Sequence, residues 1–376
     1  MIAILAPALL ALAVSFPPQG ASSVSLSDTA AQSAGSVEQL AQSAKRARDE
    51  NRDDAAIDNY HQALKLKPEW DEGLWYLGTL LYEKENYFEA CTVLRSFLAR
   101  NPGNGYGWGL LGLNEYETRE YTRALDHLQQ SMVLGLGDNR KMTSTVSYVT
   151  AILLTRSEQF DESMALLFTR VASGENPSTL VEPLGLAALR LPFQPVEIPA
   201  DRREMVHLAG AGALAVEAQR YEEADKLFNE LEARYPDRPG VHFLIGAYLL
   251  GPRPDDGIKE LKREIEISPS HIPARIRLAE EYFKRQDMNQ GISFAQEALK
   301  FEPRNGLAHM MLGEGLVAKG DSISGIKELE IAHDSLPQQA QVRWDLFRAY
   351  TAAGRFEDAK REKGEIERLS KQDAVH

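Results

Sequence analysis

Apolar residues recur along most of the chain at the three- and four-residue spacing of amphipathic helices. Between residues 71 and 102 two such runs follow each other and carry, in order, Leu74, Leu77, Gly78 and Leu81, then Ala90, Leu94 and Phe97. The polar residues 84–86 separate the runs and predict a short turn. The pattern therefore predicts a helical hairpin, and similar hairpins follow it along the chain.

Prolines mark the period of these hairpins. Pro68 and Pro102 are 34 positions apart, and Pro236, Pro269, Pro303 and Pro337 follow one another at 33 or 34 positions. Each proline comes after an amphipathic run, because proline lacks an N–H and its ring clashes with the preceding helical turn. A fixed period of this length predicts a stack of repeats, since no single hairpin buries enough surface to be stable alone.

Residues at fixed places in these units resemble the tetratricopeptide repeat. The signature of that family has Trp and Leu-Gly in the first helix, then Tyr, Ala, an aromatic residue and Pro. Trp108, Leu111 and Gly112 match its first half, and Ala124 and Leu128 continue it. The resemblance recurs with gaps from residue 37 to the C-terminal region, and a weak unit lies at residues 144–172. It implies an all-α, right-handed superhelical solenoid of helix-turn-helix repeats.

Small residues recur at one place in the first helix of most units, usually directly after leucine or isoleucine. They are Gly78, Gly112, Gly212, Gly246, Ala279 and Gly313. We expect each to let the second helix approach closely, with the alanine of that helix opposite it. Some of these glycines also complete G-x-G-x-x-G-like patterns, as in residues 107–112. A dinucleotide site needs a strand before such a pattern, so here the glycines are interpreted as helix contacts.

Departures from the period divide the chain. Residues 1–23 hold an apolar run followed by small residues, and they predict a signal peptide cleaved near Ala21 or Ser23. Residues 24–36 are expected to be a flexible lead-in, and residues 37–172 an N-terminal array. Residues 173–202 contain five prolines and predict a linker with a short helix, before a C-terminal array with a capping helix at residues 203–376. The expectation is an exported bacterial protein, periplasmic or secreted, or one anchored by an uncleaved leader.

Composition excludes several function classes. The formal net charge of −13 argues against a general nucleic-acid surface. Cys91 is the single cysteine, so no intrachain disulfide can form. The histidines have no metal-ligand spacing, and His242 and His309 stand at the tryptophan place of the repeat, where we expect them to pack near a helix start. No nucleophile elbow or separate catalytic segment occurs, so we expect no enzyme activity, no cofactor and no metal.

The resemblance implies a protein-interaction scaffold that binds a peptide or a partner helix along the concave surface of its first helices. The aromatic residues expected on that surface are Trp75, Tyr82, Tyr106, Tyr116 and Tyr148. Further along, the corresponding positions hold Phe243, Ile276, Phe283, Met310 and Trp344. The alternative for each is packing against a neighbouring repeat or the linker. A second function hypothesis is an accessory protein for envelope glycan handling or polysaccharide assembly, which would use the same aromatic side chains as stacking platforms.

Overall fold

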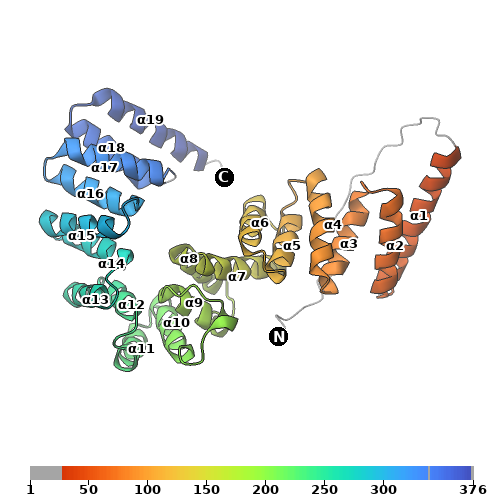
Figure 1. Cartoon of the computed structure of the whole chain (residues 1–376), viewed down its shortest axis with the longest axis horizontal. Coiled ribbons are helices and arrows are strands. Elements are labelled where there is room, and N and C mark those ends of the chain that lie inside the picture. The colour runs from red at the N-terminus through yellow and green to blue at the C-terminus, as the bar shows by residue number, and fades with distance from the viewer. Residues whose placement is uncertain (1–27, 338, 374–376) are drawn as a thin grey trace. The chain divides into compact units, whose positions relative to one another are not determined.

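The computed structural model describes residues 28–337 and 339–373, and within these ranges the regular elements are all helices (Figure 1). The predicted all-α repeat fold is confirmed. The expected signal peptide lies outside the described residues. The described residues divide into two compact units, which meet between Arg203 and Glu204; those up to Arg203 are unit 1 and those from Glu204 on are unit 2. None of the described helices is both long enough and apolar enough to cross a lipid bilayer.

Unit 1 is built from successive helical hairpins. They are α1 (Asp28–Asp49) with α2 (Asp53–Leu66), α3 (Asp71–Glu83) with α4 (Tyr87–Arg100), α5 (Gly105–Glu117) with α6 (Tyr121–Leu134), and α7 (Arg140–Arg156) with α8 (Phe160–Ala172). Helix α1 takes in residues 28–36, which we expected to be a flexible lead-in. Alanines at positions 30, 31 and 34 favour a helix there, because alanine loses least entropy on helix formation.

The proline-rich segment that follows is folded against unit 1. It contains the expected short helix, α9 (Val181–Ala188), between two single 3₁₀ turns at Pro177–Thr179 and Pro195–Glu197. Helix α9 contacts both α7 and α8. Leu184 of α9 and Leu180, which directly precedes the helix, are completely buried. The predicted linker is therefore a packed part of unit 1, because its apolar residues cover the end of the N-terminal array.

Unit 2 continues the same architecture. Its helices are α10 (Arg203–Glu217, whose first residue closes unit 1) with α11 (Tyr221–Arg234), α12 (Val241–Leu249) with α13 (Pro254–Ile267), α14 (Ile272–Lys284) with α15 (Met288–Phe301), α16 (Gly306–Ala318) with α17 (Ser322–Ser335), and α18 (Ala340–Ala352) with α19 (Phe356–Asp373). The charged helix expected at the C-terminal end is α19.

Close approach of the two helices in a hairpin depends on the small residues predicted from the sequence. A Cβ added to Gly112 would lie 2.7 Å from Cγ of Leu128, and one added to Gly212 would lie 2.3 Å from the ring of Phe228. The expected role of these glycines is thus confirmed, but the nearest partner differs. The leucine or phenylalanine of the second helix fills the space, while the carbonyl oxygen of Ala124 would lie 3.1 Å from a Cβ added to Gly112.

In eight of the nine hairpins described, the turn has a residue with a left-handed backbone at the same place, and the turn between α12 and α13 is the exception. These residues are Asn51, Glu85, Arg119, Glu158, Gln219, Gln286, Gly320 and Gly354. The next amide then bonds back to a carbonyl five residues earlier, as from Asn86 to Leu81 at 2.8 Å and from Asp287 to Tyr282 at 2.9 Å. This closure ends the first helix. A side chain at a left-handed position is disfavoured, because its Cβ crowds the following carbonyl oxygen.

Replacing Gln286 by glycine is therefore expected to stabilise unit 2. Glycine removes the Cβ crowding, and the greater entropy of glycine in the unfolded chain offsets only part of that gain, so a net increase of about 0.5–1 kcal/mol is expected. Urea denaturation followed by circular dichroism measures it. Gln286→Ala is the control, since it keeps the Cβ and should leave the stability unchanged. A Gln286→Gly variant less stable than the parent would contradict the assignment.

Candidate functional site

The five aromatic residues expected on the inner surface come from α3, α5 and α7. These first helices form one continuous row, because α3 contacts α5, α5 contacts α7 and α7 contacts α9. Trp75 is only 4% exposed, and its ring lies 5.2 Å from that of Phe97 and 5.4 Å from that of Tyr106. It belongs to the core between hairpins. A partner cannot reach Trp75 in this structure.

The four tyrosines of the set are half-buried. The hydroxyl of Tyr106 accepts a hydrogen bond from Nδ2 of Asn139 at 3.3 Å, and the hydroxyl of Tyr116 donates one to Oε1 of Gln194 at 2.9 Å. Arg170 lies over the ring of Tyr148, 5.3 Å from its centroid. Packing against the next repeat and against the segment 173–202 is thus part of the role of these side chains. Each remains partly exposed to solvent.

Glutamates border the tyrosines on this row, and the aromatic pattern alone did not reveal them. Glu83 directly follows Tyr82, and Glu117 directly follows Tyr116, 34 positions later. Both glutamates are exposed, as is Glu85 in the adjoining turn. Partial desolvation raises the pKa of Glu83, helped by the negative charge of Asp53. Partial desolvation likewise raises the pKa of Glu117, helped by Glu85.

The same crowding acts on the tyrosine hydroxyls. Burial raises the pKa of Tyr82 to about 12, and the negative charge of Glu117 contributes to the shift. Burial also raises the pKa of Tyr87 to about 12, again with contributions from Glu117 and Glu85. In the described part of the chain, no ion pair forms on Glu83, Glu85 or Glu117. We call these three glutamates with Tyr82 and Tyr116 the acidic tyrosine face.

The first helices of unit 2 differ from expectation. Phe243, Ile276 and Met310 are at least 92% buried, so they are core residues rather than surface anchors. The reason is that a first helix packs against its own second helix and against the hairpins before and after it. Trp344 is 45% exposed. A cavity of about 460 Å³ lies beside α14 and α16, and its lining includes Phe283 and Glu314.

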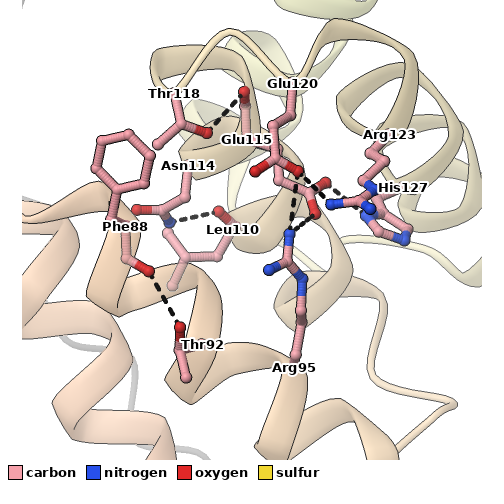
Figure 2. A network of polar contacts seen from close by, with 10 residues as sticks. All are labelled: Phe88, Thr92, Arg95, Leu110, Asn114, Glu115, Thr118, Glu120, Arg123 and His127. Atoms are coloured by element: carbon pink, nitrogen blue, oxygen red, sulfur yellow. Dashed lines mark hydrogen bonds and ion pairs between the residues drawn. The ribbon is translucent and has the colours of Figure 1, made fainter.

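A buried polar network joins α4, α5 and α6 in unit 1 (Figure 2). Glu115 is completely buried, and its carboxylate accepts hydrogen bonds from Nη2 of Arg95 at 2.7 Å and from Nδ1 of His127 at 2.6 Å. Arg123 and Arg95 both contact Glu120, at 2.6 Å and 3.4 Å. Figure 2 shows Arg95 and His127 approaching the Glu115 carboxylate from two different helices. The network ties three helices together.

The charged groups of this network are already paired with one another. A cavity of about 380 Å³ adjoins it, lined in part by Arg95, Trp108, Arg123 and His127. Its two arginines already pair with Glu115 and Glu120, and its histidine pairs with Glu115. Cys91 is buried nearby, and burial raises the pKa of its thiol to about 11, so the thiolate needed of a nucleophile is disfavoured.

Comparison with known proteins agrees with the repeat pattern. Residues 42–104 match the tetratricopeptide repeat family model. Among solved structures, the chain is similar to a crystal structure of the MamA protein, at 16% identity and a TM-score of 0.40 over 46% of this chain and 95% of that one. It is also similar to MamA 41-end from Desulfovibrio magneticus RS-1, at 14% identity and a TM-score of 0.41 over 45% of this chain and 96% of that one. No curated protein sequence matches the chain.

Proposed function

We propose that this chain, a tetratricopeptide repeat protein, is a non-catalytic interaction scaffold whose acidic tyrosine face binds a lysine- or arginine-rich segment of a partner protein. The observation that carries the proposal is the group of exposed glutamates beside half-buried tyrosines, with no ion pair on Glu83, Glu85 or Glu117 in the described chain. Repeats of this kind support a role as a protein-interaction scaffold. The negative charge of the acidic tyrosine face is the reason for proposing a positively charged partner segment.

Charge complementarity favours a cationic segment. Glu83 and Glu117 carry pKa values raised by desolvation and by neighbouring acids, so a nearby positive charge would relieve their repulsion. The tyrosine rings offer a second attraction, because lysine and arginine side chains lay their methylene groups along apolar surface and their charges over aromatic rings. The net charge of −13 adds long-range attraction for a basic partner.

The row of first helices also suits an extended ligand. Tyr82 and Tyr116 occupy equivalent places 34 positions apart, on helices that contact each other. A segment that crosses α3 and α5 would therefore meet the same pair of groups twice, a tyrosine edge followed by a carboxylate. Such repetition favours a ligand with basic residues at regular intervals over a single small molecule.

Fluorescence anisotropy with a labelled lysine-rich peptide tests the proposal. The Glu83→Gln/Glu117→Gln double variant keeps the size of both side chains and removes both charges. It is expected to weaken binding about tenfold, since two exposed or half-exposed ion pairs at about 0.5–1 kcal/mol each would be lost. Binding to the parent protein should also weaken as salt is raised, because salt screens charges on the surface.

A matched control is available on the second helices of the same unit. Asp126 on α6 and Glu162 on α8 are exposed acids away from the tyrosine row, and Asp126→Asn/Glu162→Gln removes the same charge. Equal loss of affinity in both double variants would mean that only net charge matters and would reject a defined face. Tighter binding of a soluble polysaccharide than of the peptide would favour the glycan-handling hypothesis instead.

A further inference from the structure

The tryptophan place of the repeat is the sixth position after each proline. Where a tryptophan or histidine stands there, its ring nitrogen forms a hydrogen bond with the carbonyl oxygen of that proline. The indole Nε1 of Trp108 donates to the carbonyl of Pro102 at 2.8 Å. In unit 2, Nε2 of His242 contacts the carbonyl of Pro236 at 2.7 Å, and Nε2 of His309 contacts the carbonyl of Pro303 at 3.0 Å. Both histidines are buried near a helix start, as the sequence predicted.

This hydrogen bond sets the orientation of the imidazole ring. A carbonyl oxygen only accepts, so Nε2 of His242 carries the proton, and Nδ1 is directed toward the second helix of the hairpin. There Nδ1 lies 2.5 Å from Oε2 of Glu260 on α13 and donates a hydrogen bond to it, and a metal ion bound at Nδ1 would take the place of that proton. The equivalent pair in the later hairpin is His309 with Glu328, at 2.6 Å. One histidine–glutamate pair is thus common to both hairpins.

The His242–Glu260 pair differs from the His309–Glu328 pair because a second carboxylate, that of Glu232, lies beside it. Glu232 stands four positions before Pro236, on α11. The residues four positions before the other five prolines of this series are Leu64, Leu98, Ile265, Leu299 and His333. Four of these five residues are aliphatic, whereas the residue at this place before Pro236 carries a carboxylate. Its oxygen, a carboxylate oxygen of Glu260 and a ring nitrogen of His242 all lie within 4.8 Å of one another.

We infer that His242, Glu232 and Glu260 form a binding site for a divalent transition-metal cation, such as Zn²⁺, that joins α11, α12 and α13 of unit 2. One imidazole nitrogen with carboxylate oxygens is a donor set that Zn²⁺ accepts, whereas Mg²⁺ and Ca²⁺ prefer oxygen alone. The bond from Nε2 to the Pro236 carbonyl is the outer contact that typically holds a metal-ligating histidine in place.

Two further features favour a cation at this place. In the described chain, neither Glu232 nor Glu260 forms an ion pair with a lysine or arginine, and the charged partner of Glu260 is His242. His242 is 4% exposed and both glutamates are partly buried, so water screens the site weakly. Three ligand atoms from three helices would leave room for water as a fourth ligand.

Isothermal titration of the full, untagged, chelator-treated chain with Zn²⁺ tests the inference. One saturable site per chain is expected, and Co²⁺ at the same site should give the visible absorption of a low-coordinate nitrogen- and oxygen-ligated ion. Glu232→Leu restores the residue type of the neighbouring repeats and should abolish both signals. Because leucine fits this contact in other hairpins, the variant is expected to keep the helical circular dichroism of the parent.

The second histidine–glutamate pair is the matched control. Glu328→Gln alters an equivalent pair that has Leu299 in place of a third ligand, and it should leave the titration unchanged. Saturating Zn²⁺ should also raise the melting temperature of the parent by several degrees, and that of Glu232→Leu not at all. No saturable binding, or binding that survives Glu232→Leu, would overturn the inference. Neither result bears on the acidic tyrosine face, which belongs to unit 1.

Discussion

A Gly112→Arg variant is expected to lose the folded structure around α5 and α6. A Cβ at this position would lie 2.7 Å from Cγ and 2.9 Å from Cδ2 of Leu128, and 3.1 Å from the carbonyl oxygen of Ala124. The backbone oxygen cannot move without breaking the helix, and Leu128 is completely buried. A long charged side chain therefore has no space, and destabilisation beyond about 3 kcal/mol is expected, the upper range for overpacking.

Thermal denaturation measures this effect, and the chain supplies its own control. Gly103 lies in the exposed turn before α5, and nothing stands within 4 Å of a Cβ added there. Gly103→Arg adds the same side chain two residues before that helix and should leave the melting temperature almost unchanged. Equal melting temperatures for Gly112→Arg and the parent would contradict the close approach of α5 and α6.

The Arg95→Met/His127→Leu double variant is the second change with a large expected effect. It removes both partners of the completely buried Glu115 carboxylate and leaves a charge without compensation inside unit 1. Breaking a buried ion pair in this way typically costs about 3–5 kcal/mol, because the remaining charge keeps its desolvation penalty. Urea denaturation should show the loss.

A third substitution distinguishes a buried charge from simple loss of contacts. The equivalent positions in two other first helices hold Leu81 and Leu316, so adding Glu115→Leu to the double variant gives that site an apolar residue its neighbours already use. Most of the stability should return, since an apolar group needs no partner in the core. A triple variant no more stable than the double variant would show that the buried charge is not the cause.

The sequence by itself determined the fold class. The 34-residue spacing of prolines and the apolar runs between them arise within single hairpins, where residues a few positions apart face each other. Gly112 and Leu128 are 16 positions apart, so their contact also follows from the hairpin alone. For the same reason, His242 and His309 could be placed near helix starts from their position after a proline.

The sequence also contains the residues of the acidic tyrosine face and of the proposed metal site. They stand out only when the repeats are aligned with one another. The Tyr-Glu pairs at 82–83 and 116–117 recur at the period, and Glu232 occupies a place filled mainly by aliphatic residues. Each becomes informative only when equivalent positions of the hairpins are compared. Glu115 is a similar case, because the same place holds Leu81 in α3 and Leu316 in α16.

Only the tertiary structure decided which aromatic residues are accessible and which polar residues meet. The position of Trp75 in its helix predicted a side chain on the exposed inner surface. In the structure its ring packs against Tyr106 of the next hairpin. Glu115 gains its partners from two other helices, α4 and α6, and the segment 173–202 supplies the Gln194 that bonds to Tyr116. Burial of a first helix depends on the hairpins on both sides of it, and a hydrophobic pattern read along one helix does not contain their positions.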